Sequence, residues 1–415
     1  MRLMADQPNL LWIVTTQWRA QACGYAGDPN ARTPWLDGLA SEAVNFTQAV
    51  TPHPLGPQAR AALLTGRLCP ENGVCHYHDP LPADVRTVAH ALADRGYQTG
   101  FFGKWHLAER DRSAPFVGEV HARMIVPPDR RGGFEFWEGF EGGFQLNDPW
   151  LHGTRLDSPR HFKGYQADVL GERAAHWMAQ QALPGAASGR PFFCVLSLET
   201  PHPPYHAPAP HVRAMKPAEL KLRGNVPRGG DVEQRARGEL AGYYAHLEAT
   251  DRAVGRLLTE IDLADTMVVF TSVHGDMHGS HGLFRKAWPY EESVRVPLLV
   301  RHRRPSAGGN SPEGTTSDEA VSLVDLPHMA VAWAEGREWR CKRDSAAISM
   351  PAPAAIPAQC ERAWRGYRSP RHKLILNADG SPWLYFNLAD DPLEMKNLVG
   401  DPDYAREIED LRRLA

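Results

Sequence analysis

The sequence predicts an α/β fold in which a mixed sheet is flanked by helices, with a smaller α+β subdomain at the C-terminal end. Two observations predict it. Apolar strand-like runs alternate with helical segments along most of the chain, and a hairpin signal followed by a further helix comes after them. A length of 415 residues suits one large domain with a smaller one appended. We therefore expect residues 1–335 to form the main α/β domain and residues 336–415 to form the C-terminal subdomain.

The predicted elements of the main domain follow one another without an internal repeat. Asn9 to Thr16 is a continuous apolar run, typical of a parallel strand that is buried on both faces. Thr33 and Pro34 are a typical N-cap and first helical residue. The other predicted helices are 59–65, 87–95, 166–181, 237–262 and 321–334, and the other predicted strands are 98–102, 192–198, 267–270 and 298–300.

Two regions of the chain lack this periodicity. Residues 109–165 are rich in Gly, Pro, Arg and aromatic residues, so we expect an irregular excursion over the site. Residues 303–320 form a polar linker. Beyond them, residues 373–376 and 383–386 flank an Asn-Ala-Asp-Gly turn and predict a hairpin, and a terminal helix is expected to start near Asp401.

Composition excludes several classes of protein. The chain has 46 Lys plus Arg against 49 Asp plus Glu, so its overall charge favours neither nucleic acid nor a membrane surface as a partner. No apolar run reaches the length of a membrane span, and the first residues lack a signal-peptide pattern, so we expect a cytoplasmic protein. The six cysteines contain no CxxC pair, which predicts neither a zinc knuckle nor a disulfide framework. The sequence leaves a homo-oligomer open.

Polar side chains follow the predicted strands, at the carboxyl edge where open α/β sheets bind their ligands. The densest stretch is 271–282, which follows an apolar run and contains three histidines. A Gly-rich loop with solvated histidines is the alternative interpretation of that stretch alone. The candidate residues are Thr16, Gln17, Gly56, Arg60, Lys104, His106, His202, His274 and Lys286. Cations and hydrogen-bond donors dominate this set and carboxylates are scarce, so it predicts a pocket for an oxyanion.

Several segments also resemble a known family. They are residues 9–19, 33–37, 60–67, 96–106, 201–205, 271–286, 289–293 and 384–394. In this order they resemble the type I sulfatases, a family of the alkaline phosphatase superfamily that includes choline sulfatases and phosphonate monoester hydrolases. The resemblance implies an alkaline phosphatase-like mixed sheet and a sulfatase-like main domain.

The resemblance also implies a nucleophile and a metal, and this sequence lacks both. Family members oxidise a cysteine or serine to formylglycine, and Gly56 stands at that position with no side chain to oxidise. They bind a divalent cation, usually calcium, through aspartates. Here those positions hold Thr16, with Gln17 beside it, and Val273 followed by His274. Calcium takes about six to eight oxygen ligands, so we expect no metal at these positions and no cofactor. A softer ion on His274, His278 and His281 stays open.

Three functions are compatible with this pattern. The first is a metal-independent enzyme acting by acid-base chemistry on an anionic small molecule that carries a sulfate, phosphate or carboxylate group. The second is a non-catalytic, anion-binding pseudosulfatase, and the third is sulfuric-ester or phosphonate-ester hydrolysis by an atypical route. We predict His106, His202, Lys104 and Lys286 as the catalytic residues. We predict Arg60, His274, Gln17 and Thr16 as the substrate-binding residues.

Overall fold

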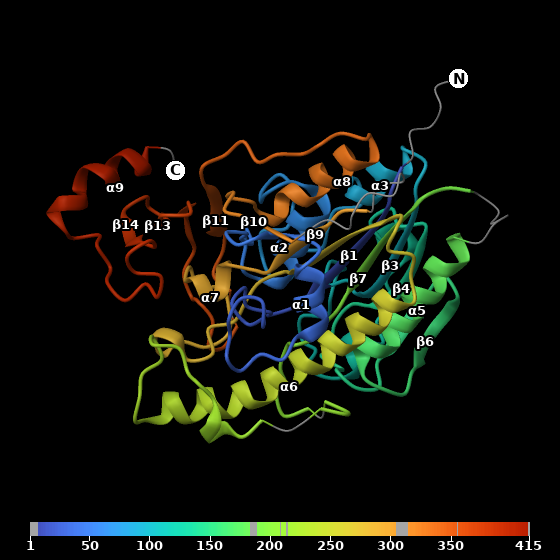
Figure 1. Ribbon diagram of the computed structural model, residues 1–415, viewed down its shortest axis with the longest axis horizontal. Coiled ribbons are helices and arrows are strands. Elements are labelled where there is room, and N and C mark those ends of the chain that lie inside the picture. Colours follow the sequence, from blue (N-terminus) through green and yellow to red (C-terminus); the bar gives the residue numbers. More distant parts are fainter. Residues whose placement is uncertain are drawn as a thin grey trace.

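The computed structural model describes residues 7–182, 189–207, 209–212, 215–303, 314–354 and 356–413. Within them, one mixed sheet of ten strands has the order β10-β2-β9-β8-β1-β7-β3-β4-β5-β6, and a second sheet has the order β11-β12-β13-β14 (Figure 1). The strands are β1 Asn9–Thr15, β2 Val44–Phe46, β3 Gln98–Lys104, β4 Phe136–Phe140, β5 Trp150–Gly153, β6 Leu156–His161, β7 Phe192–Ser197, β8 Thr266–Ser272, β9 Leu298–Arg301, β10 Thr315–Ser317, β11 Ala346–Met350, β12 Trp364–Arg368, β13 His372–Asn377 and β14 Pro382–Asn387. The helices are α1 Pro34–Ala40, α2 Gly56–Thr65, α3 Val88–Ala93, α4 Glu119–Ala122, α5 Gln166–Ala182, α6 Asp231–Thr259, α7 Glu291–Val294, α8 Leu326–Ala334 and α9 Ala405–Arg412. The predicted fold class is confirmed.

Strand β1 lies at the centre of the large sheet, parallel to both β7 and β8. Its side chains alternate between two apolar clusters. Leu11 and Ile13 pack in the cluster that includes residues of α1, α5 and α6, whereas Leu10, Trp12 and Val14 pack with residues of α2, α3 and α8. Figure 1 shows α5 and α6 on one side of the sheet and α3 and α8 on the other. Burial of each aliphatic side chain stabilises the fold by about 1.5 to 3 kcal/mol, which explains why the run is apolar on both faces.

The parallel strands bring their carboxyl ends to one edge of the sheet. In the register of the ladder, Thr15 lies beside Ser272, and Val14 and Gly103 both lie beside Ser197. The loops that follow β1, β3, β7 and β8 therefore start from neighbouring points, which places the predicted site residues together.

The prediction for residues 109–165 is wrong in part, because this segment carries regular structure. It contributes β4, β5 and β6 to the edge of the large sheet, with β4 parallel to β3. Glu138 of β4 is fully buried and pairs with Arg155 and Arg173 at 2.7 and 2.6 Å. These strands have only four to six residues each, and buried ion pairs and glycines interrupt their apolar pattern. Such short strands give no clear period-two signal.

The C-terminal prediction is confirmed for the hairpin, which β13 and β14 form in antiparallel pairing. Gly380 has a φ of +84°, which allows the tight turn between them. Strands β11 and β12 complete this sheet and did not stand out in the sequence. One apolar cluster joins the small sheet to Leu55, Ala287 and Val294 of the main domain. The boundary at residue 336 stays a prediction.

One disulfide corrects the prediction from cysteine spacing. Cys69 and Cys75 are bonded, with their Cα atoms 5.5 Å apart. Gly73 lies between them with a φ of +76°, and the chain turns back there. A search for CxxC pairs does not detect this wider spacing. Separately, none of the helices in the described ranges is both long and apolar enough to cross a membrane.

Candidate anion-binding site

A pocket of about 220 Å³ lies at the carboxyl edge of the large sheet, and we call it the central pocket. Its lining residues are Thr16, Gly56, Tyr77, Lys104, His106, Phe116, Phe144, His202, Pro203, His274, Arg285, Lys286, Ile356, Pro357 and Gln359. Seven of the residues predicted for the site are among them. Arg60 and Gln17 do not line the pocket but bind residues that do, and Val273 is packed in the apolar core instead.

Gly56 is packed closely against two polar side chains. A Cβ atom placed on it would lie 2.8 Å from Nδ1 of His106 and 3.9 Å from Nη1 of Arg60. Both nitrogens are buried, and neither has a hydrogen-bond partner among the described residues. Gly56 and Arg60 are four residues apart in α2 and therefore share a face of that helix. Arg60 is held in place because its Nη2 donates to Oγ1 of Thr16 at 3.0 Å.

Lys104, at the end of β3, forms a buried ion pair with Glu199 in the loop after β7. Lys104 Nζ lies 2.8 Å from Oε1 of Glu199, and both side chains are almost completely buried. The ammonium group also lies 4.2 Å from the centre of the Phe144 ring. Burial lowers the pKa of Lys104 to about 8, although the Glu199 carboxylate opposes this shift. Sequence analysis did not single out Glu199 because it expected few carboxylates in the site.

Lys286 belongs to a second buried network. Its Nζ donates to Oε1 of Gln17 at 2.7 Å and to Nε2 of His202 at 3.0 Å. Gln17 in turn donates to the carboxylate of Asp276, which also accepts a hydrogen bond from Tyr205 at 2.5 Å. Burial lowers the pKa of Lys286 to about 7, although Asp276 opposes the shift. The ammonium group of Lys286 thus exchanges its proton near neutral pH.

Asp276 remains a carboxylate despite complete burial. Burial alone would raise its pKa, but the charges of His278 and Arg285 and the hydrogen bond from Tyr205 outweigh it, so its pKa lies well below the usual range. This second carboxylate also corrects the prediction that carboxylates are scarce in the site.

Two of the pocket histidines have a fixed tautomer. Nδ1 of His202 lies 2.8 Å from the carbonyl oxygen of Pro203, and Nδ1 of His274 lies 2.9 Å from that of Gly275. A carbonyl only accepts, so the proton is on Nδ1 and each Nε2 carries a lone pair. Burial and the charge of Lys286 lower both pKa values well below 6.5, so the rings are neutral at neutral pH. Nε2 of His274 is a buried acceptor that no described residue satisfies.

Comparison with known proteins shows the family. The sulfatase family model matches residues 8–336. The ulvan-active sulfatase of Formosa agariphila is 33% identical over 96% of this chain and 78% of its own length. The chain belongs to the sulfatase family. The structure of a sulfatase-like protein from Bacteroides fragilis covers all of this chain and 96% of its own, with a TM-score of 0.82 and 24% identity. The phosphonate monoester hydrolase of Agrobacterium radiobacter covers 98% and 94%, with a TM-score of 0.74 and 21% identity. Both share the fold.

The residues at the family's metal positions do not fit a calcium ion. Oγ1 of Thr16 already binds Arg60 and donates to the carbonyl of Leu198, and Oε1 of Gln17 accepts from Lys286. Val273 is completely buried and apolar. Calcium needs several anionic oxygens, whereas here two cationic side chains occupy the oxygens that remain.

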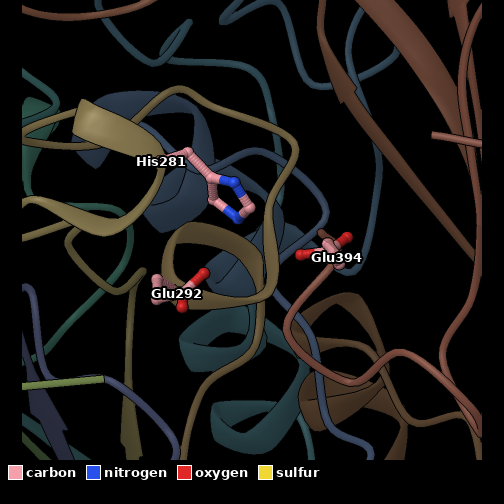
Figure 2. A group of neighbouring side chains, drawn as sticks. All are labelled: His281, Glu292 and Glu394. Carbon is pink, nitrogen blue, oxygen red and sulfur yellow. The ribbon is translucent and has the colours of Figure 1, made fainter. Parts of the chain in front are cut away.

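The histidines of the 271–282 stretch do not converge on one ion. His274 lines the central pocket, while His281 stacks on Tyr290 with the ring centres 4.2 Å apart. In the part of the chain that the structure describes, one cluster has metal-ligand character: His281, Glu292 and Glu394, shown in Figure 2. Its carboxylates already have cationic partners, because Arg223 lies 2.9 Å from Glu292 and Lys373 lies 2.7 Å from Glu394. This cluster is an ion-pair network that includes the start of α7.

Sequence analysis missed the walls of the central pocket. Tyr77 and Phe116 come from loops without periodicity, and Gln359 comes from the C-terminal region. Nothing in the sequence places these segments next to the loops that follow the strands. Among the aromatic residues of 109–165, Phe116 and Phe144 line the pocket, whereas Phe134, Phe136, Trp137, Phe140 and Trp150 do not.

Proposed function

We propose that this sulfatase-family protein binds a sulfate ester in the central pocket and hydrolyses it without a metal ion or a side-chain nucleophile. The observation that carries the proposal is a pair of buried nitrogens beside Gly56, Nη1 of Arg60 and Nδ1 of His106, which have no hydrogen-bond partner among the described residues. Buried polar groups are nearly always hydrogen-bonded in folded proteins. An oxygen of a bound anion would satisfy these two groups.

The balance of buried charge favours a monoanion. Four cations surround the pocket, namely Arg60, Lys104, Lys286 and Arg285, against the carboxylates of Glu199, Asp276 and Glu239, the last of which is paired with Arg285. The histidines are neutral at neutral pH, so one positive charge is left over. A sulfate monoester carries one negative charge, whereas a phosphate monoester carries about two at neutral pH. The name of the relative from Formosa agariphila also points to sulfate esters.

The fixed tautomer of His274 supplies a base for direct attack by water. A water molecule that donates to Nε2 of His274 loses a proton to that nitrogen as its oxygen bonds to sulfur. The bond between sulfur and the ester oxygen breaks, and the leaving oxygen takes a proton from Nζ of Lys286. The products are the free alcohol and hydrogensulfate, which loses its remaining proton to water, and Lys286 regains a proton from His274 through solvent. His202, which accepts from Lys286 at 3.0 Å, positions that ammonium group.

Turnover of p-nitrophenyl sulfate in the presence of EDTA tests this proposal, with ulvan as a second substrate. We expect hydrolysis that EDTA leaves unchanged and that His274→Gln slows about 100-fold or more, as for loss of a general base. His328→Gln is the matched control, because this histidine lies outside the pocket and its ring contacts only the carbonyl of Gly66 at 3.4 Å. Turnover that EDTA abolishes, or that His274→Gln leaves intact, contradicts the mechanism.

A non-catalytic anion-binding protein is the second candidate, and the absence of a side chain at Gly56 favours it. Calorimetry separates the two. Binding of p-nitrophenyl sulfate without turnover supports the second candidate. If calorimetry detects no binding at millimolar concentration, both proposals are wrong.

A further inference from the structure

A second pocket of about 210 Å³ lies beside Arg19, and we call it the Arg19 pocket. Its polar lining residues include Arg19, Gln21, Lys221, Arg223, Tyr244 and His278. None of these residues lines the central pocket. The two pockets are connected through Asp276, which accepts from Gln17 and has one carboxylate oxygen 3.8 Å from Nε2 of His278.

The guanidinium group of Arg19 is a buried cation whose carboxylate neighbours, Asp28 and Glu292, lie beyond ion-pair distance. The residue is only 2% exposed, and its Nε has no hydrogen-bond partner in the described part of the chain. Within the same residues, no carboxylate lies close enough to Arg19 to form an ion pair. The ring of Tyr243, with its centre 5.7 Å away, is its nearest electrostatic support. Desolvating an unpaired charge costs several kcal/mol, so this arrangement calls for an anion.

The carboxylates near the pocket already have partners. Asp28 accepts a hydrogen bond from Tyr244 at 2.6 Å, and Glu292 is paired with Arg223 at 2.9 Å. Counting these two carboxylates against Arg19, Lys221 and Arg223 leaves one positive charge. Asp28, which also lines the pocket, and Glu292 therefore balance the cations of the pocket only in part.

Other polar groups around the pocket are also unsatisfied. His278 is completely buried, and neither of its ring nitrogens has a hydrogen-bond partner in the described ranges. The same holds for Nε2 of Gln21. The ammonium group of Lys221 is exposed at the pocket. Guanidinium, ammonium and amide donors together match the oxygens of an anion.

We propose that the Arg19 pocket is a second oxyanion site, which binds the sulfate, phosphate or carboxylate group of a small anionic molecule. Arg19 provides the fixed charge at the base of the site, and Lys221 provides a second charge at its opening. This proposal does not depend on hydrolysis in the central pocket, since its residues and its unsatisfied groups are separate.

Calorimetric titration of the full chain with sodium sulfate, sodium phosphate and sodium glucuronate tests the proposal and distinguishes the three groups. If both pockets bind, we expect two anions per wild-type chain and one per Arg19→Gln chain. If the central pocket binds no anion, we expect one anion per wild-type chain and none per Arg19→Gln chain. The failure of one proposal can therefore be distinguished from the failure of the other. The Arg19→Gln variant should weaken this site about 30-fold or more. The exposed Arg67 provides the control Arg67→Gln, which should bind as the wild type does.

Two further measurements keep the test decisive if Arg19→Gln folds poorly. Lys221→Met changes an exposed side chain and should weaken the same site several-fold while the second binding event is unchanged. A crystal soaked in sodium selenate should show anomalous scattering next to Arg19. Equal titrations for the wild type, Arg19→Gln and Lys221→Met, or a selenate-soaked crystal without a peak at Arg19, would overturn the proposal.

Discussion

The central pocket and the Arg19 pocket differ in how nearby negative charge balances their buried cations. Both are cavities of similar size, about 220 and 210 Å³, and both contain buried cations. In the central pocket, Lys104 is paired with Glu199, and Lys286 reaches Asp276 through Gln17. In the Arg19 pocket, no carboxylate of the described residues lies within ion-pair distance of the guanidinium group, although Asp28 and Glu292 lie nearby. The first arrangement is stable when empty, whereas the second is stabilised fully only when an anion binds.

The two pockets also differ in the type of cation that they contain. Burial lowers the pKa of Lys104 to about 8 and that of Lys286 to about 7, so each can lose its proton near neutral pH. The guanidinium of Arg19 stays charged at every relevant pH. A pocket with titratable lysines is suited to proton transfer, while a pocket with a permanent charge is suited to binding. We infer that chemistry, if the protein is an enzyme, belongs to the central pocket.

Removal of one charge from each pocket should give the largest difference between the two pockets, measured as the free energy of unfolding. Glu199→Gln leaves Lys104 buried without a counterion and should lower the free energy of unfolding by about 3 kcal/mol. Arg19→Gln removes a charge that has no partner, so it should leave the stability unchanged or increase it. Urea unfolding at pH 7 without added anions measures both. The double variant Lys104→Met with Glu199→Gln is the control, and it should recover much of the loss.

Equal destabilisation by Glu199→Gln and Arg19→Gln would contradict the contrast. It would mean that Arg19 has an internal counterion in solution.

A methyl group at position 56 should block one pocket and leave the other intact. In Gly56→Ala the new Cβ lies 2.8 Å from Nδ1 of His106, which is too close for a carbon atom, so the ring of His106 must shift away from its position in the pocket. Overpacking costs about 1 to 3 kcal/mol, so sulfate should bind to the central pocket about 30-fold more weakly. The number of anions that bind at the Arg19 pocket should not change. Gly38→Ala is the matched control, because Gly38 also lies in a helix and its Cβ would meet no atom within 4 Å. A Gly56→Ala variant with unchanged sulfate affinity would refute the position of the anion.

The sequence predicted the central pocket well because strand order places its residues. Thr16, Lys104 and His274 each follow a strand of the parallel core, and parallel strands end at the same edge. That residue 56 is a glycine was visible in the sequence and needs no geometry to interpret, while the lack of a nucleophile in the protein stays a prediction. The apolar alternation of β1 predicted a strand buried on both faces, and the structure confirms it.

The sequence could not predict how the charges pair. Glu199 lies next to Lys104 because β7 pairs with β3, and Asp276 lies next to Gln17 because β8 pairs with β1. The unpaired state of Arg19 was equally hidden, because it depends on where Asp28 and other carboxylates find their partners. Strand β4 was missed for a local reason: its buried Glu138 interrupts the apolar pattern.

The pH dependence of binding should separate the two pockets by about tenfold per pH unit. A bound anion favours the charged form of Lys104 and Lys286, so it raises their pKa values above about 8 and 7. Affinity for sulfate at the central pocket is therefore greatest below pH 7 and falls as the pH rises from 7 to 9, by about tenfold per unit for each lysine that must gain a proton. Affinity at the Arg19 pocket should stay constant over this range.

Calorimetry at pH 6.5, 8 and 9 with two variants measures this dependence for each pocket alone. Arg19→Gln reports on the central pocket, and Lys104→Met reports on the Arg19 pocket. If the affinity of the central pocket for sulfate does not change with pH, protonation of the two lysines does not contribute to binding.

Calcium should have the smallest effect, because both pockets carry an excess of positive charge. We expect 1 mM calcium chloride, compared with EDTA, to shift the Tm of the wild-type protein by less than about 1 °C, whereas sodium sulfate should raise it. A cation present at 100 times its Kd would raise the free energy of unfolding by about 2.7 kcal/mol. Binding of calcium would therefore be clearly visible as a rise in Tm. The carboxylates of Glu292 and Glu394 are the other place where calcium could act. If calcium also raises the Tm of the Glu394→Gln variant, the ion binds elsewhere. That result would show that Thr16 and Gln17 still support a metal in the central pocket.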